Sequence, residues 1–156
     1  MVSKIQDEIR QSKPFVNVAA EAHVSLLRTA DVVGREIAEV LKPYGVSPTQ
    51  YNVLRILRGA GPSGLACGEI GGRMITQDPD ITRLLDRMEK AGWIERTRDS
   101  RDRRVVMTRL TRQGKKLTDD LEEPLSAFER RRLKRVGEKR LRDLVHLLEV
   151  VRDIGQ

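Results

Sequence analysis

The residues with the most evident capacity for chemistry form one short stretch, residues 96–104, which reads RTRDSRDRR. Five of its nine residues are arginines, two are aspartates, and none is a large apolar residue. Guanidinium groups bind phosphates and base edges through paired hydrogen bonds, and a neighbouring carboxylate can fix the direction of one guanidinium. The composition therefore indicates binding to a polyanion. A second interpretation is that the aspartates only dilute the repulsion between like charges.

The net charge of +7 is concentrated around this stretch. Residues 73–116 contain thirteen Lys and Arg against seven Asp and Glu. The counts nearly balance elsewhere, with eight against seven in residues 1–72 and nine against nine in residues 117–156. A basic centre between balanced flanks is typical of a nucleic-acid-binding surface. On charge alone, an ordinary solvated surface is the simpler interpretation.

Other chemistries find little support in the sequence. It contains no phosphate-binding glycine loop or nucleophile motif, and His23 and His146 lack cysteines or carboxylates at metal-ligand spacing. The single cysteine, Cys67, forms no intramolecular disulfide and is interpreted as a small buried residue. We therefore expect no enzyme, metal or cofactor. The absence of an apolar leader, and of about 18 consecutive apolar residues, predicts a cytoplasmic protein without a membrane partner.

Long amphipathic helices are expected on both sides of the basic centre. From Phe15 to Val40 apolar residues recur every three or four positions, and Pro14 marks the start of this helix. A shorter amphipathic segment precedes it, with Val2, Ile5 and Ile9. After the basic centre, Thr111 can cap a helix that Pro124 should kink or interrupt, and a last helix follows. The apolar stripes of these two helices are Leu117, Leu121, Leu125 and Phe128, then Leu141, Leu144, Val145, Leu148 and Val151.

Two shorter helices are expected at the start of the middle region. Ser47 offers an N-cap side chain and Pro48 the first helical position, so that a helix should run to about Arg58. The sequence GAGPSG at residues 59–64 then predicts a turn, because glycine and proline interrupt regular structure. A weaker helix is expected at residues 68–74, where two glycines lower the helix propensity.

A third helix and a β-hairpin should carry the charged residues. Asp78 and Pro79 provide a helix start signal, and Gly92 is placed to end the helix. The apolar face of this helix comprises Ile81, Leu84, Leu85 and Met88. The hydrophobic period then changes from 3.6 to 2 in residues 93–98 and 104–111, which predicts two strands. The basic stretch therefore becomes the connection of a hairpin.

Three helices followed by a basic hairpin form a winged helix-turn-helix. In that fold one helix enters the DNA major groove, while the hairpin tip contacts the backbone and minor groove. The segment ITRLLDRMEKAGWIERTRDSRDRRVVMTRLTRQGKKL, residues 81–117, closely resembles the recognition helix and wing of the MarR family, the multiple antibiotic resistance regulators. The similarity includes the Asp-Arg-Arg element before V-x-x-x-L-T and the glycine that follows. It extends from about Phe15 to Val151, although the terminal helices match only in pattern.

The resemblance implies a mostly α-helical fold with a small β-hairpin wing, in which the N- and C-terminal helices form a dimerisation domain. The corresponding regions are residues 1–45 and 117–156 for dimerisation, and residues 46–116 for the winged helix-turn-helix. It further implies a homodimer on palindromic duplex DNA, a transcription repressor that a small anionic or aromatic effector releases. No ligand-binding residue is assigned from the sequence.

The same resemblance indicates the DNA contacts. Arg104 matches the wing arginine that enters the minor groove, and Asp102 matches the aspartate that orients it. The recognition helix departs from the family at its start, where relatives are rich in serine. Here Asp80 repels phosphate, but it could accept a hydrogen bond from a cytosine amino group. The complete set of expected DNA contacts is Gln77, Asp80, Thr82, Arg83, Arg87, Arg98, Arg101, Asp102, Arg103 and Arg104.

A non-specific architectural DNA- or RNA-binding protein is the alternative function, because the basic stretch alone would suffice for it. The amphipathic recognition helix, with start and stop signals at its two ends, argues against this alternative. A strong preference for one short palindrome over random duplex would separate the two functions.

Overall fold

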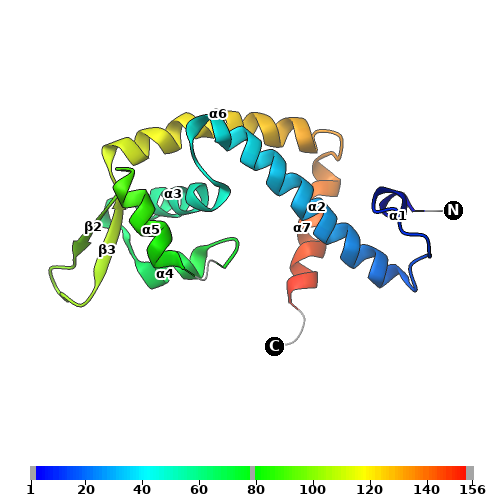
Figure 1. Ribbon diagram of the computed structural model, residues 1–156, viewed down its shortest axis with the longest axis horizontal. Helices are drawn as coiled ribbons and strands as arrows, with labels where there is room; N and C mark the ends of the chain where they lie inside the picture. The colour runs from blue at the N-terminus through cyan, green and yellow to red at the C-terminus, as the bar shows by residue number, and fades with distance from the viewer. Residues whose placement is uncertain (1–2, 78–79, 154–156) are drawn as a thin grey trace. The chain divides into compact units, whose positions relative to one another are not determined.

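The computed structural model describes residues 3–77 and 80–153 (Figure 1). These residues form two compact units, which divide the chain into residues 1–48 and 49–156. None of the helices in the described part of the chain is long and apolar enough to cross a membrane. The elements are, in chain order, α1 (Lys4–Glu8), α2 (Val18–Leu41), η1 (Lys42–Tyr44), α3 (Pro48–Ala60), η2 (Gly61–Ser63), β1 (Leu65–Ala66), α4 (Cys67–Arg73), α5 (Ile81–Lys90), β2 (Ile94–Arg98), β3 (Val106–Leu110), α6 (Arg112–Leu133) and α7 (Glu138–Arg152).

Helix α2 begins later than its sequence predicts. The predicted start at Pro14 was wrong, because the side chain of Asn17 accepts the backbone N–H of Ala20 at 2.8 Å and so caps the helix at Val18. Most of the apolar side chains of α2 are at least partly exposed, and Leu41 is its only buried residue. In the preceding segment Ile5 is buried in α1, whereas Val2 lies outside the described residues.

Helices α3, α4 and α5 supply most of the fully buried core of the second unit. Helix α3 begins at Pro48, as predicted, and ends at Ala60, two residues beyond the expected end. The turn that follows is the short helix η2, and the weak helix expected at residues 68–74 is confirmed as α4. Cys67 opens α4 and is half-buried. Among the described residues of this unit, the fully buried apolar side chains are Val53, Leu54, Leu57, Ile70, Leu85, Met88, Ile94 and Leu121.

The hairpin is confirmed, and a third strand joins it. Strands β2 and β3 pair antiparallel with Ile94 opposite Leu110, and β1 pairs with the other edge of β3, giving the order β1-β3-β2. Gly64 precedes β1 with a φ of +70°, and a Cβ atom there would collide with the carbonyl oxygen of Thr108. Glycine therefore lets the chain approach β3 closely enough to form this strand.

Helix α6 is continuous through Pro124. The side chain of Thr111 accepts the backbone N–H of Gly114 at 3.0 Å, which confirms the predicted cap. The expectation that Pro124 could interrupt the helix was wrong, since Leu121 and Phe128 on either side of it are buried and packing outweighs the lost hydrogen bond. Helix α7 follows after Gly137 and has no buried residue.

Candidate nucleic-acid interface

The start of helix α5 is set by Asp80. Its carboxylate accepts the backbone N–H of Arg83 at 3.0 Å, so that Asp80 is the N-cap and the helix begins at Ile81. The predicted start signal, Asp78 and Pro79, lies outside the described residues, and the helix begins two residues later than expected. Asp80 also lies 3.7 Å from the guanidinium of Arg83. The carboxylate of Asp80 is therefore already engaged in capping α5 and pairing with Arg83.

The two faces of α5 differ as predicted. Leu84, Leu85 and Met88 are buried, whereas the opposite face is exposed. The exposed polar residues of this region include four expected DNA contacts, Gln77, Thr82, Arg83 and Arg87. Arg87 donates to the backbone carbonyl of Arg83 at 3.4 Å, so its side chain lies along the helix surface. The helix thus presents donors on one side while its apolar side is fixed in the core.

The end of α5 is also fixed. Gly92 has a φ of +78°, and its N–H donates to the carbonyl of Glu89 at 2.9 Å. The N–H of Trp93 donates to the carbonyl of Met88 at 3.1 Å. A residue in the left-handed region after the last turn, with such hydrogen bonds back to the helix, is a common helix terminator. The predicted role of Gly92 is confirmed, and β2 begins directly after the half-buried Trp93.

The loop of the wing is organised by Asp99. Its side chain accepts the backbone N–H groups of Arg101 at 2.7 Å and of Asp102 at 3.1 Å. The backbone N–H of Asp99 donates to the carbonyl of Val105 at 2.9 Å, which closes the loop. An aspartate that bonds the backbone two and three residues ahead stabilises a turn. Asp99 therefore shapes the loop, and the interpretation that it only dilutes positive charge was wrong.

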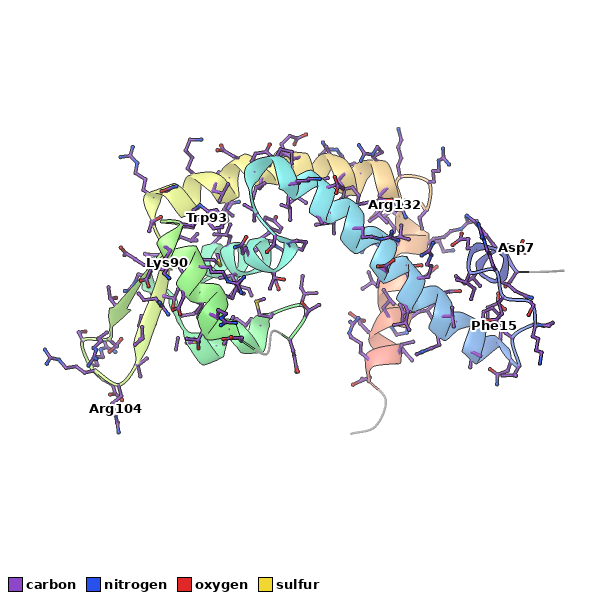
Figure 2. All side chains as sticks on the ribbon, viewed as in Figure 1. Asp7, Phe15, Lys90, Trp93, Arg104 and Arg132 are labelled. Carbon is purple, nitrogen blue, oxygen red and sulfur yellow. The ribbon has the colours of Figure 1, made fainter. Side chains whose placement is uncertain are left out.

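Asp102 holds Arg104 in a defined direction. The Nε and Nη2 atoms of Arg104 donate to the two carboxylate oxygens of Asp102, each at 3.1 Å, and the backbone N–H of Arg104 donates to the same carboxylate at 3.0 Å. Figure 2 shows Arg104 at the tip of the hairpin. Its side chain is 91% exposed. A two-point hydrogen bond orients the planar guanidinium while leaving its outer edge available to a ligand.

These hydrogen bonds stabilise the charged forms of the side chains in the wing. The backbone N–H groups of Arg101 and Asp102 lower the pKa of Asp99 below its ordinary value. The hydrogen bonds from Arg104 lower the pKa of Asp102, and the same contact raises the pKa of Arg104. Hydrogen bonds to a charged form favour that form, so both carboxylates and the guanidinium are charged at neutral pH.

Arg96 joins the wing to α5, and the sequence analysis missed this role. Its guanidinium donates to Glu89 at 2.6 and 3.0 Å and to Asp86 at 2.6 Å, while its backbone N–H donates to Glu89 at 3.1 Å. Hydrogen bonding to Arg96 lowers the pKa of Glu89, and the same contact raises the pKa of Arg96. With its side chain only 23% exposed, Arg96 is a structural tie. The three-residue spacing of Asp86 and Glu89 on one helix face was the available signal.

The remaining expected contacts lie on the wing. Arg98 ends β2, and Arg101 and Arg103 are exposed in the loop. The structure therefore gathers the expected residues into two groups, the outer face of α5 and the wing, and Arg96 ties the two together. This arrangement of a capped helix beside a basic hairpin is the winged helix-turn-helix expected from the sequence.

Comparisons with known proteins identify the family. The sequence profile of the MarR family matches residues 46–106. The uncharacterised HTH-type transcriptional regulator YsmB of Bacillus subtilis is 33% identical over 110 residues, which cover 70% of this chain and 73% of YsmB. The chain belongs to the MarR family. It is accordingly a winged-helix transcription regulator and not a member of an enzyme family.

Solved structures agree with membership of the MarR family. A MarR transcription factor from Planctomyces limnophilus is 39% identical, with a TM-score of 0.67 over 88% of this chain and 99% of that one. The repressor CouR, bound to a 23-mer DNA duplex, has a TM-score of 0.75 at 24% identity over 90% and 99% of the two chains. CouR from Rhodococcus jostii has also been solved with p-coumaroyl-CoA. At its lower identity, CouR shows the shared fold. The predicted fold class, mostly α-helical with a small β-hairpin wing, is confirmed.

Proposed function

We propose that this MarR-family regulator is a ligand-responsive repressor that binds palindromic duplex DNA as a homodimer. The observation that carries the proposal is the paired hydrogen bond between Asp102 and Arg104 at the wing tip, which fixes an exposed guanidinium. A pre-oriented guanidinium enters a narrow minor groove without losing side-chain freedom at the moment of binding.

The outer face of α5 is proposed to read the major groove. Thr82, Arg83 and Arg87 point away from the buried face and can reach base edges or phosphates. Gln77 precedes the helix and is exposed. We assign Asp80 a positioning role, because its carboxylate caps α5 and pairs with Arg83. The cytosine contact considered from the sequence becomes secondary to this role.

The arginines of the wing are proposed to have two different roles. Arg104 enters the minor groove, oriented by Asp102. Arg98, Arg101 and Arg103 contact phosphates, which contributes affinity on any sequence. Asp99 keeps the loop folded around them.

A homodimer explains the terminal helices. Leu26 and Leu27 of α2 are exposed, as are Val145 and Leu147 of α7, although each helix has a regular apolar pattern. Exposed apolar surface of this extent marks an interaction site. We propose that residues 1–45 and 117–156 form the dimerisation region, and that residues 46–116 form the DNA-binding region.

The proposed effector is a small anionic or aromatic molecule. CouR binds both a DNA duplex and an aromatic acyl-CoA in its solved structures. A ligand that binds the DNA-free form more tightly than the DNA-bound form releases the DNA by linkage. The cytoplasmic location expected from the sequence stays a prediction.

Selection of bound duplexes from a random DNA pool tests the proposal. We expect enrichment of one palindrome, with half-sites about 10 base pairs apart, one helical turn. The selected duplex should bind at least about a thousandfold more tightly than a scrambled duplex at the same salt concentration. Equal binding to all duplexes, or to RNA, would support the architectural alternative instead.

A further inference from the structure

A groove lies at the root of the wing, outside the residues assigned to DNA. It has a cavity volume of about 580 Å³. Helix α3, the turn η2, the strands β2 and β3 and the first turns of α6 all contribute to its lining. Pro62 and Leu110 are the apolar lining residues with exposed surface, whereas the side chain of Leu57 is fully buried. Concave sites with an apolar wall and a few converging polar groups are where proteins bind small molecules.

The cations around this groove differ in their partners. Arg58 pairs with two carboxylates, Asp119 at 3.1 Å and Glu122 at 3.0 Å, so its charge is not available to a ligand. Arg109 donates only to neutral acceptors, the carbonyl of Pro62 at 2.9 Å and the hydroxyl of Thr97 at 2.7 Å. Its positive charge is therefore available to an anion in the groove.

Two further cations come from the start of α6. Arg112 and Lys115 line the groove, and neither makes an ion pair with a described residue. Glu95 is the one carboxylate among the described lining residues, and its Cα lies opposite that of Arg109 in the β2–β3 register. Three cations without a carboxylate partner against one carboxylate leave the groove positively charged. An anion would be attracted to it, and most strongly one whose apolar body covers the adjacent Pro62 and Leu110.

We propose that this groove binds a small aromatic carboxylate. The carboxylate faces Arg109, Arg112 and Lys115, where guanidinium and ammonium groups donate charge-assisted hydrogen bonds. The aromatic body covers Pro62 and Leu110, the two apolar lining residues that are at least partly exposed. This assignment names the effector site of the proposed ligand-responsive function and rests on that function.

The position of Arg109 connects the groove with the wing. Arg109 belongs to β3, and its hydrogen bond to Thr97 crosses to β2 close to the loop that carries Arg104. A carboxylate in the groove competes with Thr97 and Pro62 for the same guanidinium. Occupancy therefore changes the side-chain contacts that hold the two wing strands in register at their root.

Calorimetry on the full DNA-free protein tests the groove directly. The probe is 2-naphthoate, and 2-naphthamide is the neutral molecule of the same shape. We expect one molecule of 2-naphthoate per chain, bound about tenfold more tightly than the amide, because the charged group provides the stronger hydrogen bonds. Equal affinity of the two probes, or no binding of 2-naphthoate, would overturn the proposal.

Matched variants locate the site. Arg112→Gln and Lys115→Gln should each weaken 2-naphthoate binding about tenfold. Lys116→Gln is the control, because Lys116 pairs with Asp120 at 2.6 Å and does not line the groove. All three side chains are exposed, so thermal melting should show intact folding. A loss in Lys116→Gln equal to that in Lys115→Gln would place the probe elsewhere.

A separate measurement keeps this proposal distinct from the proposed function. Binding of the selected DNA duplex is measured first without probe and then with 2-naphthoate. Probe binding by a protein that fails to bind DNA specifically would refute the regulator proposal and leave the groove assigned as a ligand site. Specific DNA binding by a protein that does not bind 2-naphthoate would refute the groove alone.

Discussion

Helices α5 and α7 both carry apolar residues at helical spacing, yet the two helices differ in what covers those residues. Leu85 of α5 has no exposed surface, and α5 contacts α4 and β2. Leu147 of α7 is 59% exposed, and no residue of α7 is buried. A hydrophobic period identifies which face of a helix is apolar. It does not identify the surface that covers that face.

The polar residues show the same difference. Around α5, Arg96 is satisfied by Glu89 and Asp86, and Arg104 by Asp102, so this region is organised within one chain. On α7 the guanidinium of Arg142 donates to Glu138 one turn away, and this contact stabilises only the helix itself. The contacts that organise α5 and the wing therefore lie within a single chain, whereas the apolar side chains of α7 are left largely exposed.

The largest expected effect tests the buried side of this comparison. Leu85→Ala should lower the free energy of unfolding by about 2–5 kcal/mol, because it removes buried methyl groups and leaves a cavity. Urea denaturation measures the change. Thr82→Ala on the exposed face is the control and should stay within about 0.5 kcal/mol of the wild type. A loss below about 1 kcal/mol for Leu85→Ala would mean that α5 is not fixed in the core.

The second prediction tests whether the exposed apolar residues of α7 form an interface. Leu147→Glu should raise the dimer dissociation constant by about two orders of magnitude, because assembly would bury an unpaired carboxylate. Sedimentation across micromolar concentrations measures this shift. Lys139→Glu, which also introduces a carboxylate on α7, is the control and should leave the dimer intact. A dimer in which Leu147→Glu has no effect would show that this face is not an interface.

The wing provides a sharper test of organisation within one chain. Arg104→Ala should weaken specific DNA binding by about tenfold to a hundredfold, and Asp102→Ala should lose a large part of the same affinity. The double variant should fall short of the sum of the two losses, because the residues act as a unit. Equilibrium binding to the selected duplex measures all three. Additive losses would show that Asp102 does not orient Arg104 on DNA.

A division between the α5 face and the wing should appear in the salt dependence. Arg83→Ala should weaken binding to the selected duplex by about tenfold while leaving the salt dependence almost intact, as expected for a base contact. Arg101→Ala and Arg103→Ala should weaken binding to every duplex. Each should lower the slope of log K against log salt by about one unit per subunit, or about two per dimer. If Arg83→Ala instead weakens binding to every duplex and lowers the salt slope, as expected for Arg101→Ala, then Arg83 contacts a phosphate.

The smallest expected effect concerns pH. Backbone hydrogen bonds lower the pKa of Asp99, so its contribution to the folded loop is present above the ordinary aspartate pKa, about 4, and lost as the pH falls through the lowered value. The amide resonances of Arg101 and Asp102 should therefore be constant between about pH 6 and 8 and shift only below about pH 4. Asp99→Asn keeps the acceptor but removes this titration, so its amides should keep only the part of the shift that comes from Asp102.

Much of the fold followed from local signals in the sequence. Pro48, Gly92 and Thr111 set element boundaries through their own backbone or side-chain chemistry, and the structure places all three as predicted. Strand β1 was missed because two residues are too few to show a period, and the strand forms only where Gly64 approaches Thr108 in space. The sequence preceding α2 misled because a proline marks a possible start, whereas a capping side chain determines the actual one.

The candidate site was predicted less completely than the fold. The pairing of Asp102 with Arg104 was expected through the family resemblance, since charge alone favoured an ordinary solvated surface. The tie between Arg96 and the two carboxylates of α5 was missed, because it joins residues across the turn at Gly92 and depends on tertiary geometry. The sequence therefore groups Arg96 with the basic stretch, although its charge is paired with Glu89 and Asp86 and is not available to DNA.

Gly114 lets the start of α6 approach the backbone that follows α5 very closely. A Cβ atom at this position would collide with the carbonyl of Trp93, which also accepts the backbone N–H of Thr111 at 3.1 Å. The hydroxyl of Thr111 donates to the carbonyl of Gly92 at 2.6 Å, so the cap of α6 is bonded to the connection between α5 and β2. Because Gly114 has no side chain, nothing separates its backbone from the carbonyl of Trp93. The first turn of α6 is therefore held directly against the backbone at Gly92 and Trp93, so a displacement of this turn has to move the chain that ends α5.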